Sequence, residues 1–369
     1  MPTQVMEAAK PAASFNRLQA KSLLGRFRSK QNTRAAFILT LDIALYLIFF
    51  AVIVVSHSLF VKLAASVVQG IVIARLFIIG HDACHGSFTT SKYWNKMLGR
   101  ISFAPSLTTF SLWDLGHNFS HHGFTNLKGH DYVWTPLSKQ EYDALPKWRQ
   151  AVERVYRGFA GFGLYYLVEL WWNKLIFPSS NHIGVDKRSH FWDSVLVTSY
   201  AALQALFLVG MAMVTGQSPW LLIAAGLVIP FLIWNITMGF VIYSHHTHPD
   251  VAWFEGRQNW NGARAQVENT IHVTFPLPFS ALLHNIMEHT AHHVEIGIPL
   301  YELIGAQDQL EESFPADIRV HNWSWAYFRN CVKCCKLYDY QQHRWMDFDG
   351  RYTSENILYA TVGAPVTRP

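Results

Sequence analysis

The chain has 369 residues, of which 50% are hydrophobic and 15% are charged, and its formal net charge is +5. Soluble domains carry about 25% charged residues, so this composition excludes an ordinary soluble globular protein. Aromatic residues make up 15% of the chain, which suits wide contact with a bilayer interface. We therefore expect an integral membrane protein with a sizeable polar portion.

The first 34 residues are strongly basic. They contain one acid, Glu7, and seven cations: Lys10, Arg17, Lys21, Arg26, Arg28, Lys30 and Arg34. The positive-inside rule places this arm, residues 1–34, in the cytoplasm. We interpret it as an amphipathic arm beside the membrane, although its low acid content also resembles an organelle transit peptide.

Four later segments are long and apolar enough to cross a bilayer, which takes about 20 helical residues. Asp42 and Arg75 interrupt the first two, where a charge is costly and usually faces the protein interior. Four crossings return the C-terminus to the cytoplasm. The predicted spans are residues 35–56, 59–80, 191–214 and 219–244.

Three further stretches are aromatic-rich or mixed in polarity. Residues 97–116 contain Pro105 and predict a membrane-dipping or interfacial stretch. Residues 156–177 carry charges among their aromatic side chains and predict a helix in the interface plane, with a fifth span as the alternative. Residues 322–345 predict a second interfacial helix.

Eleven of the nineteen histidines fall into four clusters, each near the end of an apolar segment or on the polar segment that follows it. With four spans, all four clusters lie on the cytoplasmic face and can converge on one site. An odd number of spans would scatter them. The clusters are His81-x-x-x-His85, His117-x-x-x-His121-His122, His245-His246-x-His248 and His289-x-x-His292-His293.

The spacing within these clusters suits metal binding. On an α-helix, His81 and His85 share one face, as do His117 and His121, while His122 points about 100° further round. Rigid helices can thus aim several imidazoles at one point. Histidines outside the clusters, among them His272, are expected to be surface or hydrogen-bonded residues.

The number of ligands indicates more than one ion. A catalytic zinc uses three protein ligands, and imidazole also suits iron and copper, but two adjacent irons with about four nitrogens each use the set most economically. Nearby carboxylates are candidates to fix the ring tautomers. These are Asp82, Asp114, Asp131, Glu288 and Glu295.

These residues resemble the membrane fatty acid desaturases, a family with three histidine boxes. His81-Asp-Ala-Cys-His85 is similar to the first box, H-D-x-x-H. The second box begins at Trp113 and ends at Thr125, and it is similar to the acyl-lipid branch. His246-Thr-His248-Pro and the later His284-Asn-Ile are similar to omega-6 desaturases.

The resemblance implies an all-α integral membrane protein, with four transmembrane helices and a cytosolic helical cap that holds a di-iron site. It implies eight box histidines and one ligand from beyond the fourth span, for which we favour His246 over His248 or His284. The implied iron ligands are His81, His85, His117, His121, His122, His246, His289, His292 and His293.

The resemblance also implies the activity, the insertion of a cis double bond into a lipid acyl chain with dioxygen and two electrons. His248-Pro249 is followed by Asp250 rather than by the H-P-G-G haem motif of fused cytochromes, so we expect a separate donor, a ferredoxin or a b-type cytochrome. Cations that could attract an acidic donor, or face anionic headgroups instead, are Lys139, Lys147, Arg149, Arg154 and Arg157.

Two alternatives remain open. A lipid or carotenoid hydroxylase or ketolase would share the ligands, while a polytopic metal transporter would place its ligands near the bilayer midplane. A zinc peptidase needs H-E-x-x-H, which is absent. Residues 35–310 are expected to form the desaturase domain and residues 311–369 a cytosolic segment with an interfacial helix. The membrane would be a bacterial inner membrane or the endoplasmic reticulum, and no nucleic-acid partner is expected.

Overall fold

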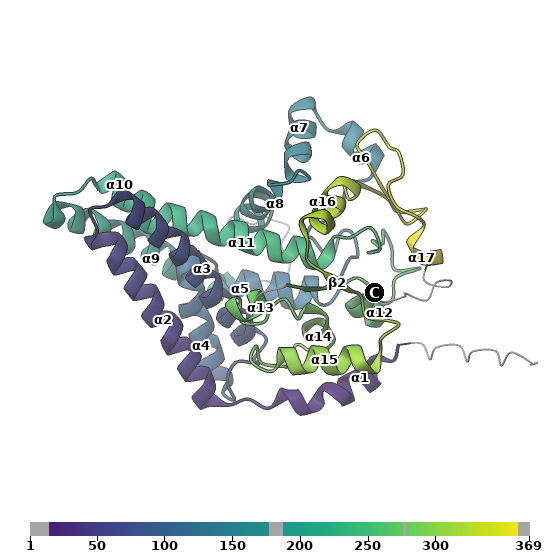
Figure 1. Ribbon diagram of the computed structural model, residues 1–369, viewed down its shortest axis with the longest axis horizontal. Helices are drawn as coiled ribbons and strands as arrows, with labels where there is room; N and C mark the ends of the chain where they lie inside the picture. The colour runs from purple at the N-terminus through teal and green to yellow at the C-terminus, as the bar shows by residue number, and fades with distance from the viewer. Residues whose placement is uncertain (1–14, 177–186, 276–277, 361–369) are drawn as a thin grey trace, which may run out of the picture.

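The computed structural model describes residues 15–176, 187–275 and 278–360. Long apolar helices gather at one end of the molecule, and a cap of shorter helices forms the other end (Figure 1). The architecture is mostly helical, as predicted. The first fourteen residues, including Glu7 and Lys10, lie outside the described part of the chain.

Four helices are long and apolar enough to span a membrane, as the sequence predicts. The first, second and third are α2 (Asn32–Val55), α3 (Leu59–Cys84) and α9 (Lys187–Thr215). The fourth, Pro219–His246, consists of α10 (Pro219–Ile223), a π-helical turn η5 (Ala224–Val228) and α11 (Ile229–His246). Pro230 follows just after this π-helical turn. It has no backbone N–H and so cannot donate the hydrogen bond of a regular α-helix, which accounts for the irregular turn before it.

Helix α3 is the central membrane helix and holds the other elements together. It packs on α2, α11 and the cap helix α4, and two-thirds of its most apolar 18-residue segment is buried. Asp42 on α2 is fully buried, and its Oδ1 accepts a hydrogen bond of 2.8 Å from Arg75 Nε on α3. The charges that interrupt the first two spans therefore face the interior, as expected.

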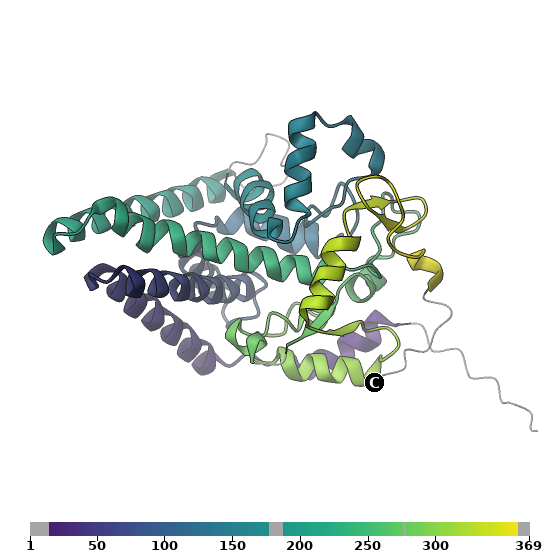
Figure 2. The same ribbon diagram turned by 45° about the horizontal axis from the view of Figure 1, so that its top comes forward.

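The cap begins where α3 ends. Its helical segments after α3 are α4 (Lys92–Phe103), η2 (Ala104–Ser106), α5 (Phe110–Trp113), η3 (Asp114–His121), α6 (Lys139–Ala144), α7 (Lys147–Tyr156), α8 (Gly161–Tyr165) and η4 (Tyr166–Ile176). Those after α11 are α12 (Gly262–Glu268), α13 (Phe279–Leu282), α14 (His289–Val294), α15 (Leu303–Ser313), α16 (Trp325–Cys334) and α17 (Ile357–Ala360). Figure 2 shows the green fourth span running from the far tip of the membrane end into this cap, where α11 ends.

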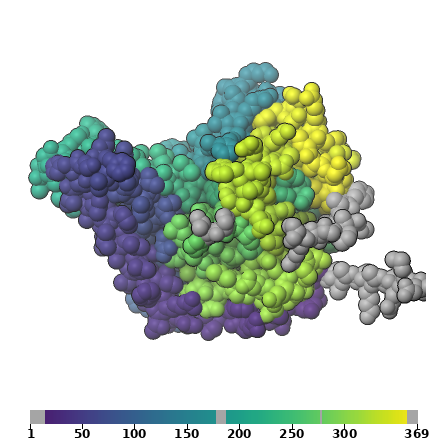
Figure 3. Space-filling view, in the orientation of Figure 1, coloured from purple at the N-terminus to yellow at the C-terminus, as the bar shows by residue number. Residues whose placement is uncertain are grey.

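The basic arm folds onto the cap. It contains α1 (Arg17–Leu24) and the short 3-10 turn η1 (Gly25–Arg28). Ala20 and Leu24 are fully buried in a cluster with residues of α14 and α15. Figure 3 shows the purple N-terminal segment along the lower edge of the molecule, beside the green α15. The arm therefore packs as an outer layer on the cap.

Two expectations need correction. The class is not purely α, because two small sheets pair β1 (His272–Thr274) with β2 (Val320–Asn322) and β3 (Leu337–Asp339) with β4 (Arg344–Met346). The predicted helix over residues 322–345 spans only α16, since the chain then turns into the β3–β4 hairpin. Trp345, at the end of the predicted helix, is instead fully buried in that hairpin.

In the aromatic stretch predicted at residues 156–177, residues 161–176 form α8 and η4, and among the described residues this segment is not one of the helices long and apolar enough to span a membrane. Phe177 lies outside the described part of the chain. Tyr165, Tyr166 and Leu170 are buried in the main core, while Trp172 is half exposed. Residues 97–116 form the second half of α4, then η2, α5 and the start of η3, with a break at residues 107–109. Pro105 lies in η2, because it cannot continue a regular helix. The membrane-dipping interpretation of this stretch remains a prediction.

Candidate metal centre

All four histidine clusters lie at the junction between the membrane helices and the cap. His81 lies in the last turn of α3, and His85 is the C-cap of that helix. His246 is the last residue of α11. The other two clusters lie on η3 and α14, both in the cap. Even-numbered spans end on the same side, so the chain order brings these segments together.

The histidines converge into two groups whose nitrogen atoms lie within 4.8 Å of one another in each group. The two groups adjoin, with the ring centroids of His122 and His293 4.3 Å apart. The first group contains His81, His85, His117, His122 and His292, and the second contains His121, His246, His289 and His293. All nine sequence-predicted residues are thus gathered at one place.

The helix geometry expected for the second cluster is wrong. An α-helix would put His117 and His121 on the same face, but η3 is π-helical, and the backbone N–H of His122 donates to His117 O at 3.0 Å. In a π-helix residues i and i+5 bond to each other, so His117 and His122 share the first group. His121 is turned into the second group.

The ring nitrogens face one another at short distances. In the first group, His117 Nε2 lies 3.1 Å from His81 Nε2 and 3.0 Å from His122 Nε2. In the second, His289 Nε2 lies 2.9 Å from His246 Nε2 and 3.0 Å from His293 Nε2. Two neutral imidazoles meet this closely only when a proton or a cation lies between them.

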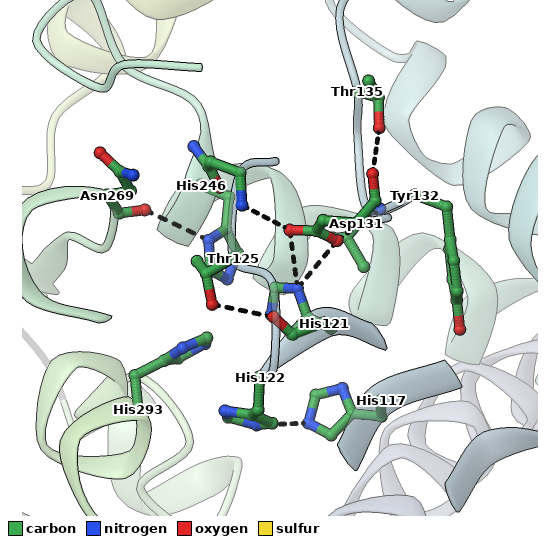
Figure 4. Close-up of polar contacts among 12 residues, drawn as sticks. His117, His121, His122, Thr125, Asp131, Tyr132, Thr135, His246, Asn269 and His293 are labelled. Atoms are coloured by element: carbon green, nitrogen blue, oxygen red, sulfur yellow. Dashed lines mark hydrogen bonds and ion pairs between the residues drawn. The ribbon is translucent and has the colours of Figure 1, made fainter. Parts of the chain in front are cut away.

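Several rings donate their proton from Nδ1, on the edge of the ring opposite the inward-facing Nε2, as Figure 4 illustrates for His121 and His246. His121 Nδ1 donates to both oxygens of Asp131 at 3.1 Å, and His246 Nδ1 donates to Asn269 O at 3.3 Å. His293 Nδ1 donates to a side-chain oxygen at 2.9 Å. Three of the four rings in the second group therefore turn a lone pair inward, an arrangement that fits a bound cation.

Burial favours the neutral form of several of these imidazoles. Seven of the nine are buried and the other two, His85 and His117, are half-buried. Burial, and then the neighbouring imidazoles, lower the pKa of His117, His122 and His293 well below the usual value. Neutral imidazole is the form that binds a transition metal, so the donor set suits iron, copper or zinc.

Two of the five candidate carboxylates reach a ring of the groups. Asp82 Oδ1 lies 3.2 Å from His81 Nδ1, and its Oδ2 accepts the backbone N–H of Leu300 at 2.5 Å. Asp131 holds His121. The remaining three bond elsewhere: Asp114 to Cys84 and Asn118, Glu288 to His272 and Ser280, and Glu295 to Lys21, Arg28 and Gly297.

Sequence reasoning missed two polar groups around the centre. Gln266 Oε1 accepts from His293, and its Nε2 donates to His122 O at 2.9 Å, so one side chain braces both groups. Asn269 acts through its backbone carbonyl, which no side-chain pattern reveals. His272 was expected to be a surface or hydrogen-bonded residue, and it is hydrogen-bonded, since it lies 2.7 Å from Glu288 and 2.5 Å from Glu311.

Three histidines outside the two groups take different places. His245 is fully buried and stacks on His289 at 4.0 Å between centroids, but it belongs to neither group. His248 lies with Asp250 and His321 in a separate cluster. His284 Nε2 is 2.5 Å from Asp42 Oδ2, away from both groups. Among the candidates for the ninth position, the geometry favours His246.

The sequence model of the fatty acid desaturase family matches residues 57–325, which include both histidine groups. This chain belongs to that family. The predicted resemblance is therefore confirmed, and the protein is a membrane fatty acid desaturase, an enzyme of the oxidoreductase class. The metal-transporter alternative finds no support.

Several relatives of this desaturase carry more specific names. It is 28% identical over 281 residues to an sn-1 oleoyl-lipid 12-desaturase from Picosynechococcus, covering 76% of this chain and 77% of the relative. It is 29% identical over 271 residues to a protein of the same name from Synechocystis, covering 73% and 74%. A chloroplastic omega-6 fatty acid desaturase from Arabidopsis thaliana is 26% identical over 280 residues, which are 76% of this chain but only 60% of the relative.

Proposed function

We propose that the nine grouped histidines hold two iron ions, and that this desaturase uses them to insert a cis double bond into a lipid acyl chain. The observation that carries the proposal is the pair of adjoining groups with inward-facing Nε2 atoms. Five nitrogens in one group and four in the other match two ions better than one. Dioxygen and two electrons complete the reaction.

When bound, the iron pair supplies the oxidising power to remove hydrogen from an unactivated methylene, which no side chain provides. The residues of this chain position that pair. Asp82 and Asp131 fix the proton of His81 and His121 on Nδ1, which leaves Nε2 free to bind. The buried setting of the rings excludes bulk water.

An acyl chain esterified to a membrane lipid is the substrate class that we propose. Two relatives are named for an oleoyl lipid and a third for an omega-6 fatty acid, and the match to the family model, residues 57–325, includes the whole ligand set. The histidine groups lie where α3 and α11 leave the membrane end. The acyl chain of a lipid in the adjacent leaflet is therefore close to them. The position of the new double bond is part of the test.

We place the centre on the cytoplasmic face. The described part of the basic arm packs on the cap next to α14, so the arm and the centre share one side of the membrane. The positive-inside rule assigns that side to the cytoplasm. A separate ferredoxin or b-type cytochrome would supply electrons from there.

The cations first considered for attracting the donor are largely occupied. Arg157 is buried and donates to Trp134 O and Thr135 O. Arg149 pairs with Glu169 at 2.7 Å, and Lys139 pairs with Asp143 at 2.5 Å. Paired cations contribute little net field, which weakens the case for α6 and α7 as the docking face.

The decisive experiment expresses the chain in a host rich in monounsaturated lipid, with fatty acid profiling of the lipids and metal analysis of the purified protein. We expect a new diunsaturated acyl chain and about two irons per chain, a stoichiometry set by two groups of four to five imidazoles. A matched His246→Gln variant should lose the new acyl chain and about half or more of the iron. Purified protein that holds only zinc, or lipids that gain a hydroxyl group instead of a double bond, would contradict the proposal.

A further inference from the structure

A cavity of about 260 Å³ lies between the N-terminal helix and the histidine groups. Its walls include two cations of α1, Arg17 and Lys21, and one histidine from each group, His122 and His293. Asn118 lies beside them. The cavity therefore joins a basic surface helix directly to the edge of the metal centre.

Three polar atoms in these walls have no partner among the residues that the structure describes. They are Arg17 Nε, Asn118 Oδ1 and His122 Nδ1, and each is shielded from solvent. A buried polar atom without a partner costs roughly 1–3 kcal/mol, and more when it is charged. Three such atoms around one cavity indicate that a polar group occupies it.

The chemistry of that group follows from His122. Its Nε2 points at His117 Nε2 and His292 Nε2, so Nδ1 lies on the opposite edge of the ring and must donate its proton elsewhere. Two other rings, His81 and His121, donate the same proton to a carboxylate. His289 and His292 also have an orphaned Nδ1, but neither borders this cavity.

The charge of Arg17 also indicates that the occupant of the cavity is an anion. No described residue forms an ion pair with Arg17, whereas Lys21 lies 3.7 Å from Glu295. An unpaired guanidinium together with an imidazole N–H is a donor set for an anion with planar oxygens. A retained water can serve Asn118 Oδ1, because the cavity exceeds the roughly 10–15 Å³ that one water requires.

We propose that this cavity binds a carboxylate group, with Arg17 and His122 as its donors. The inference rests on the proposed function, since it takes His122 Nε2 as a metal ligand. The carboxylate completes for His122 the arrangement that Asp82 and Asp131 provide for their rings. It belongs either to a small free carboxylic acid or to an acidic side chain of the electron donor.

The test uses the full-length, iron-loaded protein in lipid nanodiscs in its ferrous form, with ¹³C-formate as the probe. Formate bound in the cavity lies near paramagnetic iron, so its NMR line broadens saturably with protein concentration. Loss of one charged hydrogen bond in Arg17→Gln should weaken formate binding roughly tenfold. The matched control Lys147→Gln removes the same charge from α7 and should bind formate as the wild type does.

A second arm identifies the source of the carboxylate. An oxidised plant-type [2Fe–2S] ferredoxin is added to the formate-bound protein. If the donor supplies the carboxylate, ferredoxin narrows the formate line, and Arg17→Gln weakens ferredoxin binding more than Lys147→Gln does. If the natural occupant is a free acid, the line stays broad. Either result supports the carboxylate site.

The proposal is overturned if formate shows no saturable broadening, or if Arg17→Gln broadens it like the wild type. Iron content and desaturation are measured on the same samples. Protein that holds two irons and desaturates lipid but ignores formate refutes the cavity assignment alone. Protein without iron refutes the proposed function instead, so the two failures are distinct.

Discussion

The Nε2 atom of His284 lies 2.5 Å from the Oδ2 atom of Asp42, 242 residues earlier in the chain. Asp42 is on the first membrane helix, and Arg75 on the second helix binds its other oxygen. Arg75 also donates to Leu282 O at 2.8 Å. This triad ties the loop before α14 to the membrane helices and so fixes the position of the fourth histidine cluster, His289-x-x-His292-His293.

Asp42→Asn should destabilise the protein by roughly 3 kcal/mol, because breaking a buried ion pair leaves Arg75 without its counter-charge. We expect a lower thermal unfolding temperature in detergent and reduced iron retention. The double variant Asp42→Leu with Arg75→Leu replaces the pair by apolar contacts and should recover part of the loss. A single variant as stable as the wild type would show that the triad does not hold the loop.

Asp131→Asn should weaken metal binding by about 10–100-fold, the usual cost of losing the partner of a ligating histidine. The amide can no longer accept from His121 through both atoms, so the ring loses its fixed tautomer. Metal titration into the metal-free protein measures the change. Asp143→Asn, an exposed change on α6, serves as the control and should bind metal normally.

The adjacent residues His245 and His246 make a sharp test of the ligand assignment. His246→Gln removes a member of the second group, and bound iron should fall by about half or more, as one of two sites fails. His245→Gln should retain both irons, because His245 only stacks on His289. Equal iron loss in the two variants would contradict the assignment of His246, and not His245, as an iron ligand.

His272 gives the protein a pH-dependent stability. Burial alone would lower its pKa, but the hydrogen bonds to Glu288 and Glu311 raise the pKa of His272 to about 9. The unfolded value is about 6.5, so the contribution is complete below pH 6.5 and disappears as the pH rises through 9. The free energy of unfolding should fall by an amount on the order of 3 kcal/mol across this window.

Thermal unfolding at pH 6 to 10 tests this expectation. His272→Gln should be less stable at pH 6 and should show a flatter profile, because it has no proton to lose. His130→Gln, a change on an exposed turn, should keep the slope of the wild type. An unchanged slope in His272→Gln would assign the pH dependence to other groups.

The sequence predicted the four spans well because apolar length is a local property. It also located the nine histidines, since their clusters stand out against an apolar background. It could not predict the turn at His117–His122, because α and π geometries share one sequence pattern and tertiary packing selects between them. Gln266 and Asn269 were missed because they reach the centre from a segment without any repeating signal.

Neighbours along the chain serve different groups: His121 and His122 diverge, and so do His292 and His293. If each group holds one ion as proposed, the first ion to bind orders backbone that the second ion needs. Uptake should then be cooperative, so that limiting iron yields a mixture of empty and doubly filled protein with few singly filled molecules.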